Sequence, residues 1–344
     1  MATRGEVVQV SNLKKHYDIT SGFLKRNAGV LRAVDDVSFT IFEGETLGMV
    51  GESGCGKSTI GKSILRAHEI TDGSVVYHFD DQVMDVSYKS LKDLRTNGFR
   101  KHSQMIFQDP NSSLDPRMTV KEIISEPLLY NAKMSNKDIE NRVVQLMERV
   151  GLDKQYLKRY PHAFSGGQRQ RISIARALST NPRFIVADEP TSALDVSIQA
   201  QILNLIQELQ QEFNMSYLFI SHNLGVIRRM SDRVAVMYLG RLVELAPNEA
   251  FFRTPKHPYS EALMRSVPIA DPTVKSGMEA APGEVGNPLN PPTGCYFHPR
   301  CIYAKEVCRL EQPQFREIEN ERFVACHEAD EITLKGVSER NIKV

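Results

Sequence analysis

A glycine-rich stretch, "GESGCGKST" at residues 51–59, constrains the fold of this chain more than any other feature. It matches the pattern G-x-x-x-x-G-K-[ST], with Gly51, Gly56, Lys57 and Ser58 at the fixed positions. An apolar run precedes it and a helix-compatible stretch follows, which is the context that such a loop requires. The glycines let backbone N–H groups curl around phosphate oxygens, while Lys57 adds a charge at the β- and γ-phosphates and Ser58 ligates Mg²⁺. We therefore expect a nucleotide here, bound also by the remaining loop residues Ser53, Gly54, Cys55 and Thr59.

Two further apolar runs end in polar side chains. "RFIVADEP" (183–190) ends in Asp188 and Glu189, and "SYLFISHN" (216–223) ends in His222. Buried parallel strands have this pattern, with active groups at their carboxyl ends. In a chain with a phosphate loop, we expect Asp188 to hold Mg²⁺ and Glu189 to polarise the attacking water as general base.

The segments between the apolar runs predict helices. Residues 197–213 carry apolar side chains at helical spacing and predict a crossover helix, while 234–246 predict a hairpin around Gly240. Strands that alternate with helices indicate an α/β fold with a mostly parallel sheet.

The middle of the chain lacks the alternation of strands and helices and has a helical pattern instead. Residues 119–177 are predicted to be mostly helical and to form a subdomain inserted into the α/β core. Within this region Ser135 is a predicted N-cap, and Gly151 a predicted helix stop.

Composition excludes some function classes. Lys+Arg 43 against Asp+Glu 42 leaves a net charge of +1, which does not favour nucleic acid as a partner. No apolar run approaches the roughly 18 residues that span a bilayer, and the N-terminal segment lacks the apolar core of a secretory signal. We expect a soluble, cytoplasmic protein that reaches a membrane only by docking onto a partner.

The stretch "FSGGQRQRISIARAL" (164–178) resembles the signature motif of ATP-binding cassette (ABC) ATPases, here Ser165, Gly166, Gly167 and Gln168. A Ser-Gly-Gly turn that opens a helix offers a hydroxyl, N–H groups and a helix dipole to a phosphate. The resemblance implies that this phosphate belongs to ATP on a second cassette, paired head to tail. A serine-capped surface helix is the alternative.

Further motifs of the same family occur in order. Gln108 in "QMIFQDP" resembles the glutamine that senses Mg²⁺ and the attacking water. Asp195 in "SALD" resembles the residue that crosses the cassette interface, and His222 the switch histidine at the γ-phosphate. Tyr17 in "LKKHYDI" resembles the aromatic residue that stacks on adenine. The resemblance covers about residues 6–250 and implies a RecA-like P-loop ABC ATPase core, with residues 1–250 as the nucleotide-binding domain.

The remaining residues, 251–344, resemble the C-terminal extension of oligopeptide and dipeptide uptake ATPases, in "FFRTPKHPYSEALMRSVP" (251–268), "PPTGCYFHPRCIYAKEVC" (291–308) and "ACH" (325–327). This implies an importer subunit, peripheral on the cytoplasmic face of the membrane. Its implied partners are a related, non-identical cassette subunit, two permeases and an extracytoplasmic binding protein. Relatives of this type also serve nickel or oligosaccharide uptake. The rival readings are a soluble, non-transport cassette ATPase and a cassette that binds ATP without hydrolysing it.

Four of the five cysteines lie in this extension: Cys295, Cys301, Cys308 and Cys326. A reducing cytoplasm disfavours stable disulfides, which leaves metal ligands or plain core residues. The spacing C-x5-C-x6-C-x17-C lacks the C-x2-C pairs usual in zinc ribbons. The resemblance implies a [4Fe–4S] cluster on these four thiols, with zinc as the second choice. His298 and His327 lie close enough in sequence to be substitute ligands or neighbours, but neither role is favoured.

Overall fold

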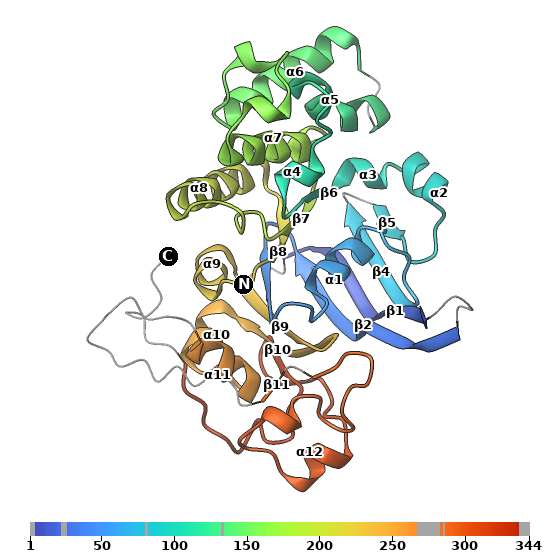
Figure 1. The fold of residues 1–344 in the computed structure, drawn as a ribbon, viewed down its shortest axis with the longest axis vertical. Coiled ribbons are helices and arrows are strands. Elements are labelled where there is room, and N and C mark those ends of the chain that lie inside the picture. Colours follow the sequence, from blue (N-terminus) through green and yellow to red (C-terminus); the bar gives the residue numbers. More distant parts are fainter. Residues whose placement is uncertain are drawn as a thin grey trace. The chain divides into compact units, whose positions relative to one another are not determined.

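The computed structural model describes residues 4–21, 26–79, 82–131, 134–266, 283–284 and 286–336 (Figure 1). The chain divides into two compact units. The first unit comprises residues 1–8, 40–45 and 76–219, and the second comprises 9–39, 46–75 and 220–344. Within the described ranges, no helix has the length and apolar character needed to cross a membrane.

The first unit contains three neighbouring strands, β6 (Ser103–Ile106), β7 (Phe184–Asp188) and β8 (Ser216–Ile220), with β7 between the other two. β6 and β7 run parallel, with Met105 opposite Val186. All residues of β7 and β8 are buried, as expected of strands covered on both faces.

Helices make up most of the rest of the first unit. Three of them, α5, α6 and α7, pack against one another (green in Figure 1). The described residues between Val120 and Leu178 form helices and turns and no strand, in agreement with the predicted helical region. The elements of this unit are α2 (Leu91–Thr96), α3 (Phe99–His102), α4 (Pro110–Ser113), α5 (Val120–Asn131), α6 (Asn136–Arg149), α7 (Gly166–Leu178), α8 (Val196–Phe213), β5 (Gln82–Asp85) and the 3-10 turns Lys154–Tyr156 and Pro161–Ala163.

The second unit is built on strands in the order β11-β12-β10-β9-β3. β3 (Thr46–Val50) and β9 (Arg233–Tyr238) run parallel, and β10 (Arg241–Pro247) returns antiparallel to β9. Two strands of the C-terminal extension, β12 (Arg322–Val324) and β11 (Arg316–Glu319), continue the sheet from β10. Its helical elements are α1 (Lys57–Ile64), α9 (Leu224–Met230), α10 (Asn248–Arg253), α11 (Pro258–Arg265), α12 (Glu306–Leu310) and the 3-10 turn His298–Arg300.

A separate four-stranded sheet has the order β2-β1-β4-β5. Its long strands are β1 (Glu6–Ser21), β2 (Arg26–Phe42) and β4 (Asp72–Phe79), and the boundary between the two units passes through each of them. β4 and β5 form an antiparallel pair in which Tyr77 faces Met84.

The expected α/β fold with a parallel sheet is confirmed. The crossover helix is α8, the hairpin around Gly240 is β9–β10, and Ser135 caps α6 by accepting a hydrogen bond from the N–H of Asp138. The C-terminal extension is joined to the sheet by strand pairing between β12 and β10. The division at residue 250 stays a prediction.

Candidate functional site

The phosphate loop lies in the second unit, between β3 and α1. Gly51 has φ +154°, and a Cβ there would overlap the carbonyl oxygen of Met237. Gly56 has φ +109°, and a Cβ there would overlap the carbonyl oxygen of Ala33. These two positions accept only glycine, both for backbone conformation and for space. The loop is therefore held tightly against neighbouring backbone, as a cradle of N–H groups must be.

Lys57 is folded into the loop that it follows. Its side chain is 5% exposed, and its Nζ donates to the carbonyl oxygens of Gly51 at 2.8 Å and Glu52 at 3.0 Å. Cys55 is also buried, which raises the pKa of its thiol, and its carbonyl accepts a hydrogen bond from the N–H of Gly240 at 2.9 Å. Cys55 thus fills space in the turn. Ser53 and Gly54 are exposed beside it, while Ser58 and Thr59 lie in the first turn of α1.

The predicted hydrolytic residues lie in the first unit. Asp188 is the buried last residue of β7, and Glu189 follows with φ +45°, a conformation that side-chain-bearing residues rarely adopt. Gln108, in the loop after β6, donates from Nε2 to Oε2 of Glu189 at 3.0 Å. The structure therefore brings together two residues that the sequence separates by 81 positions. A backbone held in an uncommon conformation beside such a contact is characteristic of functional sites.

The signature stretch opens α7. Ser165 accepts a hydrogen bond from the N–H of Gln168, whose side chain accepts one from the N–H of Ser165 at 3.0 Å, a complete capping box. A Cβ at Gly167 would lie 2.6 Å from Cγ2 of Ile198 in α8. The N-terminus of α7 therefore lies close to the first turn of α8. Ser165, the N-cap of α7, is exposed to solvent.

The other predicted nucleotide contacts occupy surface positions. Gly166 lies beside Leu194, and Asp195 is the exposed residue that precedes α8. His222 follows β8 and is exposed.

Tyr17 is half-buried in β1, and Nζ of Lys15 lies 4.5 Å from the centre of its ring. Burial raises the pKa of Tyr17. One face of this ring is therefore covered by a cation, and the predicted adenine stacking would use the other.

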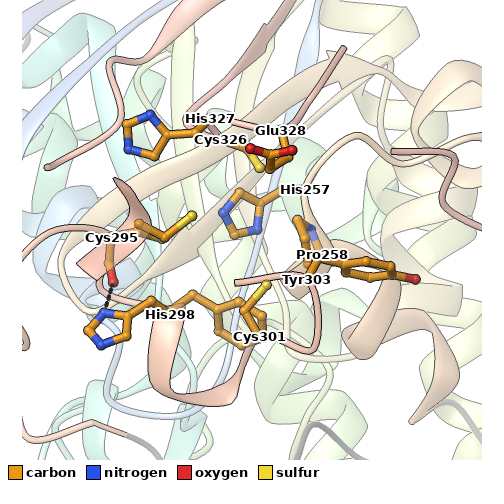
Figure 2. Close-up of a pocket in the computed structure, with 11 residues that line it drawn as sticks. His257, Pro258, Cys295, His298, Cys301, Tyr303, Cys326, His327 and Glu328 are labelled. Carbon is orange, nitrogen blue, oxygen red and sulfur yellow. Dashed lines mark hydrogen bonds between the residues drawn. The ribbon is translucent and has the colours of Figure 1, made fainter. Parts of the chain in front are cut away.

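The four extension cysteines meet at one cavity of the second unit, of about 20 Å³, which is close to the space of one water molecule. Figure 2 shows Cys295, Cys301 and Cys326 around the ring of His257, and Cys308 also lines the cavity. All four are free thiols. Burial raises the pKa of Cys301 to about 11 and that of Cys326 to about 12. The neighbouring extension thiols raise both pKa values further.

The thiol cavity has suitable donor atoms for a metal centre, but its donors are not grouped around one point. The donor set is all sulfur, which suits an iron–sulfur cluster. Among the described residues, however, no three His, Cys, Asp or Glu side chains are grouped closely enough to hold a metal ion. Nδ1 of His298 lies 2.9 Å from the carbonyl oxygen of Cys295, and Nε2 of His327 lies 3.0 Å from that of Glu311. Each histidine keeps its second ring nitrogen, so their place beside the thiols stays a prediction.

Sequence reasoning missed several residues of this region. His257 is 1% exposed, accepts a hydrogen bond at Nδ1 from the N–H of Tyr259 and reaches into the thiol cavity from the start of α11. Arg300 and Tyr259 contact the phosphate loop through Glu52. The only available signal was the match of "KHPYSEAL" and "FHPRC" to the extension, and it does not single out a residue.

Comparisons with known proteins agree with these features. Residues 34–192 match the family model described as ABC transporter, and residues 243–308 match the oligopeptide/dipeptide transporter C-terminal region. The oligopeptide transport ATP-binding protein AppF of Bacillus subtilis is 48% identical over 95% of this chain and 98% of its own. The di/tripeptide transport ATP-binding protein DppF of Pseudomonas aeruginosa is 45% identical over 94% of this chain and 98% of its own.

Solved structures show the same fold. A dimeric ATP-binding cassette in a post-hydrolysis state, bound to ADP and Pi, superposes with a TM-score of 0.61 at 28% identity, over 70% of this chain and 98% of that chain. Relatives match this chain over nearly their whole length, through both the cassette and the extension. The chain therefore belongs to the ABC transporter family, as an ATP-binding cassette ATPase that carries the oligopeptide/dipeptide transporter C-terminal region.

Proposed function

We propose that this chain is the ATP-hydrolysing subunit of an importer for oligopeptides or dipeptides, which cross the membrane through separate permease subunits. The observation that carries the proposal is the similarity to peptide-transport ATP-binding proteins over 95% of the chain, including the C-terminal region. Nickel or oligosaccharide uptake is the alternative, and the relatives described above favour peptides.

In this proposal Glu189 is the general base. Its carboxylate takes a proton from the attacking water, and the contact with Gln108 orients the carboxylate toward that water. Lys57 exchanges its loop carbonyl partners for the β- and γ-phosphates of ATP. His222 contacts the γ-phosphate, and Tyr17 stacks on the adenine.

Mg²⁺ accompanies ATP in this chemistry, and the residues assigned to it carry suitable donor atoms. Ser58, Asp188 and Gln108 offer a hydroxyl, a carboxylate and an amide oxygen, the donor types that Mg²⁺ prefers. When bound, the ion neutralises charge that develops on the phosphates. The signature residues Ser165 to Gln168 and Asp195 act on the ATP of the partner cassette, for which the exposed N-terminus of α7 is suited.

A groove in the first unit supports docking of a permease. It has about 600 Å³ of open space and is lined by the loop from Asn111 to Met118 with Ile123, Glu126 and Arg176. Arg176 donates from Nη1 to the carbonyl oxygen of Ser113 at 2.6 Å and so fixes the loop that directly follows Gln108. A helix from a permease, seated in this groove, would be coupled to hydrolysis through that short connection. In this proposal the chain works at the cytoplasmic face of the membrane.

Co-expression with candidate permeases, a partner cassette subunit and a binding protein tests the proposal. The assembled complex in vesicles should hydrolyse ATP and accumulate a labelled dipeptide or oligopeptide, and Glu189→Gln should abolish both. ATP turnover with uptake of nickel or an oligosaccharide instead would favour the alternative. Failure to co-purify with any membrane protein would exclude the transport role.

We further infer that the four extension thiols hold a [4Fe–4S] cluster. A single zinc ion would hold four sulfurs at about 2.3 Å from one centre, a grouping that the described residues do not form. The four free thiols line one cavity and would supply the four thiolates that a [4Fe–4S] cluster requires. The cluster would stabilise an extension that has a small core of its own.

Iron content and visible absorbance of anaerobically purified protein test this inference. Wild type and Cys55→Ala should carry about four irons per chain, because Cys55 lies in the phosphate loop. Cys308→Ala should lose iron and colour. Colourless wild-type protein, with or without stoichiometric zinc, would contradict the cluster.

A further inference from the structure

The second residue of the phosphate loop, Glu52, is held by an arginine of the C-terminal extension. Arg300 donates from Nη1 to Oε2 of Glu52 at 2.8 Å and from Nη2 to Oε1 at 2.9 Å. The side chain of Arg300 is 7% exposed and that of Glu52 is 26% exposed. A two-pronged arginine–carboxylate pair that is sheltered from water fixes geometry as well as adding energy.

A second residue of the extension fixes the backbone at the same position. The N–H of Glu52 donates to the hydroxyl oxygen of Tyr259, at 2.8 Å, and the Tyr259 side chain is completely buried. Both the side chain and the backbone of Glu52 are therefore anchored by residues that lie outside the loop.

These anchors are themselves firmly packed. Tyr259 lies 4.7 Å from Tyr238 and 5.3 Å from Phe297 between ring centres, and the guanidinium of Arg300 lies 5.7 Å from the ring of Phe297. Phe297 also lines the thiol cavity. The contact with Glu52 is thus the end of a rigid aromatic cluster rather than a chance surface pair.

We propose that Arg300 is a positioning residue for ATP binding, and that it acts by holding Glu52 and thereby the phosphate loop. The reason lies in Lys57, whose Nζ now donates to the carbonyl oxygen of Glu52. When Lys57 turns to a phosphate, as proposed above, this internal tie is released. Arg300 and Tyr259 then keep residue 52 in place, so that the loop N–H groups still converge on the phosphates.

A double-mutant cycle on the full chain tests the proposal, with a fluorescent ATP analogue and Mg²⁺ as the probe. Arg300→Met and Glu52→Gln should each weaken binding about tenfold, and the double variant should be no worse than either single variant. Arg300→Lys retains the charge and should recover part of the affinity. In the assembled transporter, KM for ATP should rise by a similar factor while kcat changes less than twofold.

Arg322 provides the matched control. It is an equally buried arginine of the extension that pairs with Glu244 at 3.5 Å and binds the carbonyl oxygen of Thr254. Arg322→Met should change ATP affinity less than twofold. Equal effects of Arg322→Met and Arg300→Met, additive effects in the cycle, or unchanged affinity of Arg300→Met would each overturn the proposal.

Lys57→Ala separates this inference from the assignment of the ATP site. It should abolish binding if the loop is the ATP site. Undiminished binding by Lys57→Ala would refute the proposed role of Lys57 and with it the argument for Arg300. If Lys57→Ala loses ATP binding while Arg300→Met binds ATP with normal affinity, only the role of Arg300 is refuted.

Discussion

Gln108 donates a hydrogen bond from Nε2 to Oε2 of Glu189 at 3.0 Å, and this contact joins the loop after β6 to the end of β7. Since the loop of Gln108 continues into the groove-lining segment, a shift there changes the surroundings of the carboxylate. The contact thus connects the proposed docking groove to the proposed general base.

The first prediction concerns this pair. Glu189→Gln should lower ATP turnover by about 10²- to 10⁴-fold, the usual contribution of a general base, and leave ATP affinity nearly unchanged. Gln108→Ala should lower kcat less, because the base remains and only its orientation is lost. Turnover by the assembled complex and ATP binding by the isolated chain measure the two effects. Unaltered kcat in Glu189→Gln would exclude it as the base.

The second prediction compares two N-cap serines of the first unit. Ser165→Ala and Ser135→Ala each remove a hydrogen bond to a helix N-terminus and should each lower the free energy of unfolding by about 1 kcal/mol. Only Ser165→Ala should also reduce ATP turnover by paired cassettes, because Ser135 has no proposed nucleotide contact. Equal turnover in the two variants would show that Ser165 acts solely as a cap.

The third prediction concerns space at the phosphate loop. Gly51→Ala should lower the free energy of unfolding by at least about 3 kcal/mol, because its Cβ would overlap the carbonyl of Met237. Gly54→Ala is the control, since it has φ +79° but no atom within 4 Å, and should cost about 1–2 kcal/mol. Urea unfolding followed by circular dichroism suits this chain, which has no tryptophan. Equal midpoints for the two variants would contradict the role of crowding.

The fourth prediction concerns Asp35, a buried carboxylate of the second unit. Asp35 is 6% exposed, accepts hydrogen bonds from Nη2 and Nε of Arg241 at 2.7 and 3.0 Å, and lies 3.1 Å from His16. Burial raises the pKa of Asp35, but Arg241 and His16 lower it by more, so its pKa lies below the usual value. Because the folded pKa is the lower one, the stabilisation is present above the unfolded pKa of about 3.9 and is lost as pH falls through the folded pKa.

Asp35→Asn should therefore lower the free energy of unfolding by about 3 kcal/mol at pH 7, since it leaves Arg241 without its partner. The difference from wild type should be present at pH 5 and shrink as pH falls below about 3.9. Asp72→Asn, which removes an exposed pair with Lys14, should leave the urea midpoint unchanged. A difference that grows on acidification would contradict this assignment.

Local patterns in the sequence predicted much of this structure. The strand, loop and helix around the phosphate loop follow from glycines placed where backbone must come close. The cap at Ser135 and the crossover helix α8 follow from hydrogen-bonding capacity and apolar spacing. In each case the cause lies within a few residues of its effect.

Relationships across long sequence distances could not be predicted in this way. Arg300 and Glu52 are 248 residues apart, and the local sequence around either residue does not indicate a contact with the other. The composition identified the four extension thiols, but the ring of His257 comes among them only through packing of α11. The motifs identify Gln108 and Glu189 separately, and their hydrogen bond follows only from the fold.

The pairing of β12 with β10, where Val324 faces Glu244, has a consequence for proteolysis. Cleavage that removes β11 and β12 would leave β10 with a row of unpaired N–H and C=O groups at a sheet edge, open to any passing strand. The same cut would uncover Glu244, which is fully buried, and Val243, which is nearly so. A clipped chain should therefore self-associate. Limited digestion followed by light scattering would show whether the solubility of the cassette depends on β12.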